Sequence, residues 1–339
     1  MPTQRIHNLD LLKFILCIFV VFLHVDTPYR VYTTPLTRCA VPCFFIISGF
    51  LLYSENIQAK ILRSIKKNAI ILLWSTVVFA VIYVPLWIRN NIPDFITWQS
   101  IVDFILFNEN PFGFHLWYLS AYVYALAILY VASKRSGKGI KVIFVITPLL
   151  LLADLALGTY SRIVFGEIFN YKYARNFLFV GLPYMSIGML LKKYAKAIFG
   201  RLPCAIPIIG CVVFTATSFA EKFLLIKYDA FPIREHYISS TFLAVSLFMT
   251  FYQLQIRHAN ILCKAGKEDS LYIYIFHPIF MTIFTILMSF CSNKLALSIY
   301  VLTSPLIVLL STIISIRVFR MALAKLQAIR QNSRNVFDN

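Results

Sequence analysis

The stretch that decides the fold is LDLLKFILCIFVVFLH, which runs from Leu9 to His24. It is apolar enough to enter a membrane, where about 20 residues of helix cross a hydrocarbon core ~30 Å thick. It nevertheless carries an acid, a lysine and an imidazole. At about 100° per residue, Lys13 and His24 return to within about 20° of each other and share one helix face. The pattern predicts a membrane helix with a polar stripe.

Asp10 and Cys17 fall close to the line through Lys13 and His24, and large apolar residues cover the rest of this helix. At roughly 1.5 Å per residue, Lys13 and His24 are about 16 Å apart along the axis. Ionisable groups in a membrane cost roughly 2.5–3.5 kcal/mol each, so they normally face a protein interior or a watery cavity. The stripe is therefore a candidate functional site. The alternative is that Lys13 reaches the headgroups and His24 only hydrogen-bonds within a packed bundle.

The composition is that of a multi-pass membrane protein. Of the 339 residues, 60% are apolar and 14% are charged, which places the chain outside the soluble globular class. The seven cysteines are scattered without a CxxC pair, and no His/Cys/Asp/Glu group has metal-ligand spacing. Neither a disulfide framework nor a metal site is expected. The first apolar run lacks a small-residue cleavage site, so it is expected to remain as an anchor.

Splitting the apolar runs at charged and Pro/Gly-rich breaks predicts an all-α bundle of about ten membrane helices, forming one domain over residues 1–339. The approximate spans are 9–26, 38–55, 68–88, 116–133, 142–157, 174–191, 203–221, 237–255, 269–290 and 295–316. The longest outer connection, 89–115, contains a predicted amphipathic helix, Trp98–Phe107. Loops of this length are often functional.

The formal charge of +18 follows mainly from membrane topology. With both termini cytosolic, 22 of the 32 Lys and Arg residues fall on the inner side, as the positive-inside rule requires. The excess would secondarily attract anionic lipid headgroups or a polyanionic cytosolic ligand. Nucleic-acid binding is not expected, because no soluble basic domain is present.

The second span contains TRCAVPCFFIISGFLLY, from Thr37 to Tyr53. Arg38 lies at its outer end, and Ser48-Gly49 interrupts a run of large residues. A small pair of this kind lets another helix approach closely, and the serine hydroxyl can hydrogen-bond across helices. Close packing against the first span is the simplest expectation for this pair.

These features resemble the integral-membrane acyltransferase-3 family, which includes O-acetyltransferases of bacterial surface polysaccharides and lipid-linked sugars. Lys13 with His24 is similar to the family's basic-x10-histidine signature, and VPCFFIISGFLL to its second helix. Further similarities are RSIKK at 63–67 leading into LWS, HLWYL at 115–119 and SLYIYIFH at 270–277. The chain departs from the family in having lysine where arginine is commonest, and Asn68-Ala69-Ile70 where a proline usually follows the basic cluster.

The resemblance implies a multi-pass enzyme of the bacterial inner membrane that moves an acyl group, most often acetyl, from cytosolic acyl-CoA to a hydroxyl of an envelope glycan or lipid-linked sugar. His24 is then the candidate base for the hydroxyl proton. Lys13 is a candidate for positioning the donor, and Arg38 for stabilising an oxyanion or an anionic acceptor. The candidate donor-phosphate contacts are Arg63, Lys66 and Lys67, and the candidate substrate contacts are Ser48, His115, Trp117, Tyr118 and His277.

Two rival functions stay open at this point. The first is a carrier or flippase for a lipid-linked sugar or small solute, with His24, Asp154 and Lys13 as relay or substrate groups. The second is a non-catalytic membrane sensor or interaction module. The sequence contains no GxSxG, GxxxxGK[ST] or GxGxxG motif, so an enzyme or pump that relies on these devices is disfavoured.

The charge distribution makes a prediction about topology. A reporter active only in the cytosol, fused after Arg334, should be active in cells, because the flanking basic residues hold that end inside. The measurement is the activity of paired cytosolic and extracytosolic reporters at this site. Extracytosolic activity would invert the assigned orientation.

Overall fold

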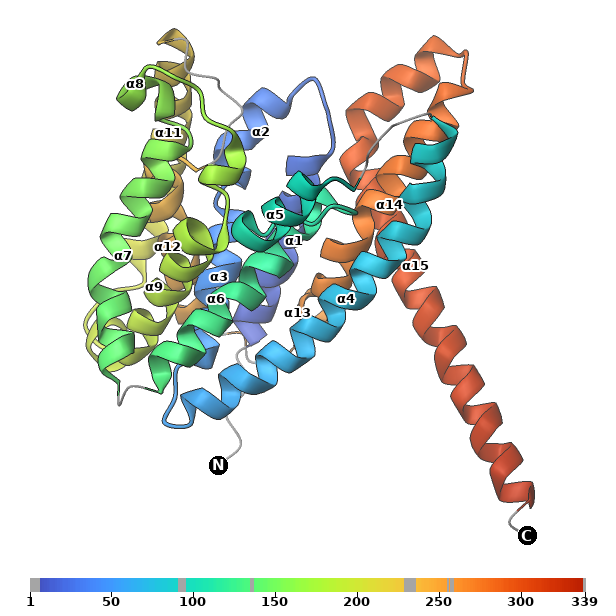
Figure 1. The fold of residues 1–339 in the computed structure, drawn as a ribbon, viewed down its shortest axis with the longest axis horizontal. Coiled ribbons are helices and arrows are strands. Elements are labelled where there is room, and N and C mark those ends of the chain that lie inside the picture. Colours follow the sequence, from blue (N-terminus) through green and yellow to red (C-terminus); the bar gives the residue numbers. More distant parts are fainter. Residues whose placement is uncertain are drawn as a thin grey trace.

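The structure is a computed structural model that describes residues 7–90, 96–134, 137–228, 236–254, 256 and 259–337, with side chains described as far as Gln327. The described residues form helices and no strand (Figure 1). The elements are α1 His7–His24, α2 Arg30–Thr37, α3 Ala40–Leu52, α4 Ile57–Arg89, α5 Trp98–Phe107, η1 Phe114–Leu116, α6 Trp117–Ser133, α7 Lys138–Leu157, α8 Ser161–Phe165, η2 Tyr171–Tyr173, η3 Phe177–Gly181, α9 Leu182–Lys193, α10 Ala195–Phe199, α11 Ala205–Lys227, α12 Ile238–Gln253, α13 Ile261–Glu268, α14 Ser270–Ser289 and α15 Lys294–Phe337.

The predicted all-α membrane bundle is confirmed. Eight helical segments of the described residues are long and apolar enough to cross a membrane. The two remaining predicted spans coincide with shorter segments, the π-helical η3 continued by α9, and the 16-residue α12. The start of α1 and the end of α15 lie at the same end of the bundle (Figure 1), in agreement with termini on one side.

Helix α1 lies inside the bundle (Figure 1), in contact with α2, α3, α12, α13, α14 and α15. Asp10 and Cys17 are buried, and Lys13 and His24 are half-buried. The polar stripe therefore faces other helices. This arrangement is expected from the cost of exposing ionisable groups to hydrocarbon.

Helix α3 packs most closely against α9, because each contributes a glycine at their crossing. A Cβ at Gly49 would lie 2.0 Å from the carbonyl oxygen of Met185, and one at Gly188 would lie 2.0 Å from that of Ile46. Small residues allow such close backbone approach between membrane helices. The expectation that Ser48-Gly49 packs against the first span was wrong for the glycine, because its close neighbour is α9.

The outer loop before α6 is tied down by side chains. Helix α5 has the bounds predicted from its amphipathic pattern, and it starts with a capping box between Thr97 and Ser100. It ends at Asn108, whose left-handed backbone conformation (φ 58°) suits an asparagine cap. The Asn108 side chain accepts from the Phe177 amide (2.7 Å) and donates to the Trp117 carbonyl (3.3 Å). The loop therefore presents the start of α6 in a fixed position.

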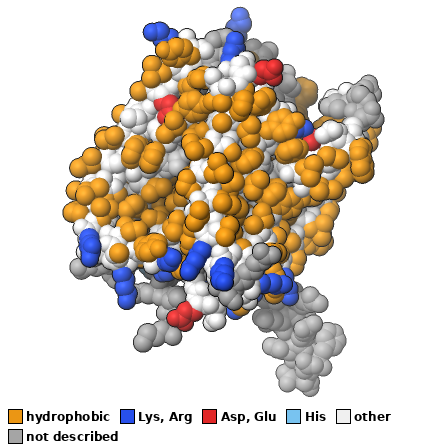
Figure 2. Space-filling view, turned by 60° about the vertical axis from the view of Figure 1, so that its left-hand side comes forward, with side chains coloured by type: hydrophobic (Ala, Val, Ile, Leu, Met, Phe, Trp, Pro, Cys, Tyr) orange, Lys and Arg blue, Asp and Glu red, His pale blue; other side chains and the backbone are white. Residues whose placement is uncertain are grey.

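Charge divides the two ends of the bundle. Lys and Arg gather along the lower edge of the molecule, and hydrophobic side chains cover the wall above it (Figure 2). We call this lower edge the basic end; it carries the α3–α4 turn, the start of α7 and the segment after α9. The positive-inside rule assigns the basic end to the cytosol.

The α3–α9 crossing predicts that Gly188→Ala destabilises the protein. The added methyl group would collide with the Ile46 carbonyl, and overpacking of this kind typically costs about 1–3 kcal/mol. The apparent melting temperature of the purified protein in detergent should fall by several degrees. Ala216→Leu, at an exposed position of α11, is the control and should melt as the native chain does. Unchanged melting of Gly188→Ala would refute the close crossing.

Candidate functional site

A cavity lies beside Lys13, between α1, α3, α4, α6 and α14. It consists of two adjoining hollows of about 370 and 320 Å³ that share Lys13, Ser48, Ser64 and Tyr122, and we call it the Lys13 cavity. The remaining lining residues are Val20, Val41, Phe44, Ile47, Leu51, Leu52, Lys60, Arg63, Lys67, Asn68, Tyr118, Leu119, Ser270, Leu271 and Tyr274.

The Lys13 cavity is strongly cationic. Lys13, Lys60, Arg63 and Lys67 all line it, and no aspartate or glutamate does so. The amine of Lys13 lies 3.2 Å from Oδ1 of Asp10, which partly offsets one of the four charges. The three others come from the first turns of α4 next to the basic end. The cavity therefore suits a ligand that carries several negative charges.

The upper part of the cavity is lined by hydroxyl groups and aromatic rings. Tyr122 hydrogen-bonds Ser64 at 3.1 Å, and the hydroxyl-bearing side chains of Ser48 and Tyr118 line the same hollow. The ring of Tyr118 stacks at 6.3 Å from that of Tyr122 and meets that of Tyr274 edge-on at 5.2 Å. This lining suits an uncharged arm with amide and apolar groups.

No histidine of the described residues lines either hollow of the Lys13 cavity, but the upper hollow reaches α1 close to His24. Val20 is its lining residue nearest to His24 on α1, one helical turn away. Nδ1 of His24 lies 2.8 Å from the carbonyl oxygen of Val20. A carbonyl only accepts, so Nδ1 carries the proton and Nε2 keeps its lone pair. His24 is thereby set in the form that can act as a base.

His277 packs against His24, and His115 packs in turn against His277. The ring of His277 lies 5.0 Å from that of His24 and 5.9 Å from that of His115. His277 uses Nδ1 to donate to the carbonyls of Ile273 (3.0 Å) and Tyr274 (2.9 Å), and His115 uses Nε2 to donate to that of Ile275 (3.1 Å). Nε2 of His277 and Nδ1 of His115 are buried without a partner. We call these three residues the imidazole cluster.

Tyrosine and asparagine side chains hold the imidazole cluster in place. The hydroxyl of Tyr274 donates to the carbonyl of His115, and Asn110 donates to Thr76 at 2.7 Å, which ties the loop before η1 to α4. The exposed ring of Phe114 lies 5.8 Å from that of His24. The sequence places His24, His115 and His277 far apart, and only the loop and α14 together bring them into contact.

Guanidinium groups surround the cluster on the side away from the basic end. Arg30, Arg38 and Arg175 all act electrostatically on His24. Arg175 lies 5.1 Å above the ring of the buried Trp117, so it covers one face of the indole. The same guanidinium lies 3.7 Å from Glu109, whose pKa is raised mainly by burial. Arg30 is likewise paired with Asp26, so acids partly offset the positive charge near the candidate base.

A second ion pair secures the same loop. Lys172 lies 2.9 Å from both carboxylate oxygens of Asp103, and this hydrogen bonding raises the pKa of the lysine. The pair joins α5 to η2. It therefore fixes the short outer helix beside the segment that carries Arg175.

The structure divides the predicted site residues into groups. Lys13, Ser48, Arg63, Lys67 and Tyr118 line the Lys13 cavity, and His24, His115 and His277 form the imidazole cluster. Lys66 is exposed and lines neither described hollow. Arg38 caps the C-terminal end of α2 on the outer side, and Trp117 is buried under Arg175. Each proposed role stays a prediction.

Several lining residues were missed from the sequence. Tyr122 and Tyr274 lie three to four residues from predicted site residues, and Ser64 and Asn68 lie four residues apart on α4. Residues at this spacing share a helix face, so the signal was present. In the sequence, a polar side chain that lines a cavity cannot be told from one on a lipid-facing helix. Only the packing of the helices separates these two cases. Among the described residues, no group of three His, Cys, Asp or Glu residues is placed to hold a metal ion.

The fold and the site together define a multi-pass membrane protein with a cationic cavity and, one helical turn beyond it on α1, a cluster of imidazoles. The family model described as "Acyltransferase domain", that of the acyltransferase-3 family, matches residues 6–316, and the chain belongs to this family. This confirms the resemblance seen in the motifs. Membership supports membrane acyltransferase activity.

A serine/alanine racemase from Enterococcus gallinarum is similar to this chain, with 24% identity over 306 residues. The match covers 83% of this chain but 40% of that protein, so the chain spans well under half of its relative. No solved structure matches the chain.

The Lys13 cavity predicts a pattern of thiol labelling. In Ser64→Cys the new thiol lines the cavity, so a membrane-impermeant maleimide applied from the basic end should label it. Ser75→Cys is the matched control, because Ser75 is buried on the same helix outside the cavity lining. Peptide mass spectrometry distinguishes labelling at either introduced thiol from labelling at the native cysteines. Equal labelling of the two variants would contradict an open cavity.

Proposed function

We propose that the chain transfers an acyl group, in the simplest case acetyl, from acyl-CoA at the basic end to a hydroxyl of a cell-envelope glycan or lipid-linked sugar. The observation that carries this proposal is the juxtaposition of a cavity lined by four cations and no acid with a histidine in the basic tautomer. The family membership supplies the reaction class.

The residues of the Lys13 cavity fit an acyl-CoA donor. Acyl-CoA would supply the activated acyl group as a thioester. Lys60, Arg63 and Lys67 are placed to attract its phosphates, since cations in a partly enclosed site attract anions more strongly than in open water. The hydroxyls of Ser48 and Tyr122 line the route beyond them. The donor would then be oriented along the axis that leads to His24.

Lys13 fits a positioning role within this cavity. Its amine forms an ion pair with Asp10, and Lys13 lies about 16 Å from His24 along the helix. Charges this far apart interact weakly. Lys13 is therefore assigned to holding the donor, while the proton chemistry is assigned to the imidazole cluster.

His24 is the proposed general base. Its Nδ1 is committed to the Val20 carbonyl, so Nε2 is the atom that takes the proton of the acceptor hydroxyl. The hydroxyl oxygen would form the ester bond to the acyl carbon as the carbon–sulfur bond to CoA breaks. The leaving thiolate would take up the proton, so CoA departs as the free thiol. The ring of His277 packs against that of His24, and Nε2 of His277 presents a second lone pair. Arg38 and Arg175 are placed to stabilise negative charge on the outer side of the cluster.

The acceptor would approach from the outer side, where Phe114 and the 108–117 loop lie beside the cluster.

A carrier for the unmodified acceptor is the main rival, and it would work without acyl-CoA. The buried Asp154, which that rival invoked, contacts His236 at 3.0 Å and lines neither hollow of the Lys13 cavity. The geometry therefore favours the enzyme.

The proposed base predicts the effect of His24→Ala. Loss of a general base typically lowers rates by about 100-fold or more, so transfer from labelled acetyl-CoA to envelope glycan in membranes should fall to background. His7→Ala, on the same helix outside the imidazole cluster, is the matched control and should keep its activity. Protein abundance and melting temperature should be unchanged in both.

Two outcomes separate the alternatives. Robust glycan labelling by His24→Ala would remove His24 as the base. Movement of unmodified acceptor by the native chain without acyl-CoA, together with no glycan labelling, would favour the carrier.

A further inference from the structure

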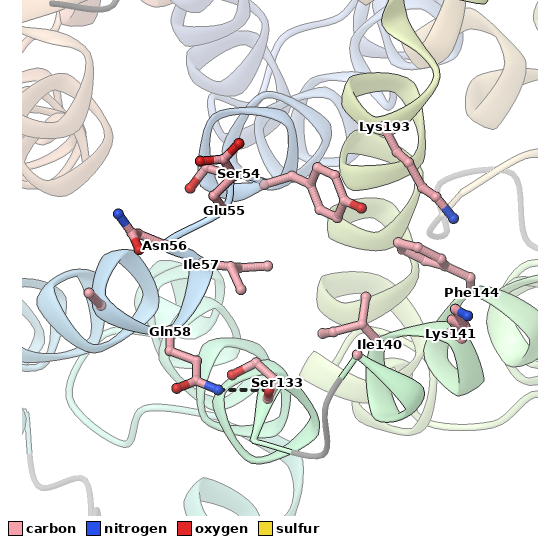
Figure 3. Close-up of a pocket in the computed structure, with 13 residues that line it drawn as sticks. Ser54, Glu55, Asn56, Ile57, Gln58, Ser133, Ile140, Lys141, Phe144 and Lys193 are labelled. Carbon is pink, nitrogen blue, oxygen red and sulfur yellow. Dashed lines mark hydrogen bonds between the residues drawn. The ribbon is translucent and has the colours of Figure 1, made fainter. Parts of the chain in front are cut away.

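A second pocket, of about 650 Å³, opens at the basic end (Figure 3). It shares no lining residue with the Lys13 cavity, and it lies between the α3–α4 turn, the end of α6, the start of α7 and the end of α9. We call it the α7 pocket. The residues that matter for its chemistry are Glu55, Gln58, Ser133, Lys141, Phe144 and Lys193.

The walls of the α7 pocket are held by specific contacts. The side-chain amide of Gln58 donates to the carbonyl of Ser133 at 2.8 Å, which joins the start of α4 to the last turn of α6. The amine of Lys193 lies 5.6 Å from the ring centre of Phe144 and 4.9 Å from that of Tyr194. Cation–π contacts of this kind restrain an otherwise flexible lysine. The pocket therefore has a defined shape.

The charges of the α7 pocket lie on opposite sides. Figure 3 shows Glu55 on the α3–α4 side and Lys141 and Lys193 across the pocket from it. This arrangement suits a ligand with an anionic group at one end and a hydrogen-bond donor at the other. It differs from the Lys13 cavity, which no acid lines. A compact polyanion would be repelled by Glu55, so the α7 pocket is not a second site for the same donor.

An apolar stripe continues from the pocket along the outside of α7. Val145, Leu149 and Leu152 follow Lys141 at helical spacing on one face, and they are 79%, 66% and 62% exposed. Basic pockets at the cytosolic side of membrane helices recur as sites for phospholipid headgroups. Here the cation and the lipid-facing stripe belong to the same face of one helix.

We propose that the α7 pocket binds one glycerophospholipid whose headgroup can donate a hydrogen bond. The phosphate lies between Lys141 and Lys193, the distal ammonium or hydroxyl group donates to Glu55, and the acyl chains lie along Val145 and Leu149. This site is separate from the proposed acyl transfer and does not depend on it. It would fix α6, α7 and α9 against the α3–α4 turn from the membrane surface.

The test is native mass spectrometry of the purified full-length chain with phosphatidylethanolamine, phosphatidylglycerol and phosphatidylcholine of identical acyl chains. The first two should bind about tenfold more tightly than phosphatidylcholine, whose headgroup has no donor. Lys141→Ala with Lys193→Ala should weaken binding of the first two lipids about tenfold or more, because it removes both cations that face the phosphate. The matched control is Lys138→Ala with Lys196→Ala, two exposed lysines outside the pocket that remove the same charge.

Two further measurements make the proposal specific. Glu55→Gln should reduce the preference for phosphatidylethanolamine over phosphatidylcholine, because it removes the partner of the ammonium group. Glycerophosphoethanolamine, which has the headgroup without acyl chains, should not compete at equal concentration. Equal binding of the three lipids, equal losses in the two double variants, or full competition by the soluble headgroup would each overturn the proposal.

Discussion

The arrangement of the bundle depends on the cost of placing ionisable groups in a membrane. Lys13 and Asp10 occupy a helix that is mostly apolar, and hydrocarbon cannot solvate them. They must therefore face protein, and α1 is surrounded by six other helices. The approach is closest at α13, where a Cβ on Gly266 would lie 1.8 Å from the carbonyl oxygen of Asp10. The ion pair and the glycine together explain why α1 lies inside the bundle.

Burial of α1 then separates two kinds of chemistry along its length. Near the basic end, side chains of α4 add positive charge to that of Lys13 and create a cavity for an anion. One turn beyond the cavity, backbone carbonyls fix the tautomers of three packed imidazoles. A helix carbonyl is a rigid acceptor, so each ring keeps one nitrogen unprotonated without needing a carboxylate partner. The same scaffold thus holds both the cationic cavity, where we propose that the donor binds, and His24, the proposed base.

The Lys13 cavity and the α7 pocket show how one acidic residue changes the ligand that a cationic site can accept. Lys60 and Arg63 line a cavity with no acid, which suits a polyanion. Lys141 and Lys193 face Glu55 across the α7 pocket, which suits a ligand with separated charges. Net charge alone, which the positive-inside rule explains, does not distinguish these sites.

The sequence by itself determined the membrane class, the positions of the ten helical segments, the short helix at Trp98–Phe107 and the shared face of Lys13 and His24. These follow from apolar length and helical periodicity, which are local properties. The family resemblance of its motifs also predicted His115 and His277 as site residues. Only the tertiary structure decided that Gly49 meets α9, that Trp117 lies under Arg175, and that Tyr122 and Tyr274 line the cavity. These are contacts between segments far apart in the chain, and no periodicity within one helix specifies which neighbour its polar face will meet.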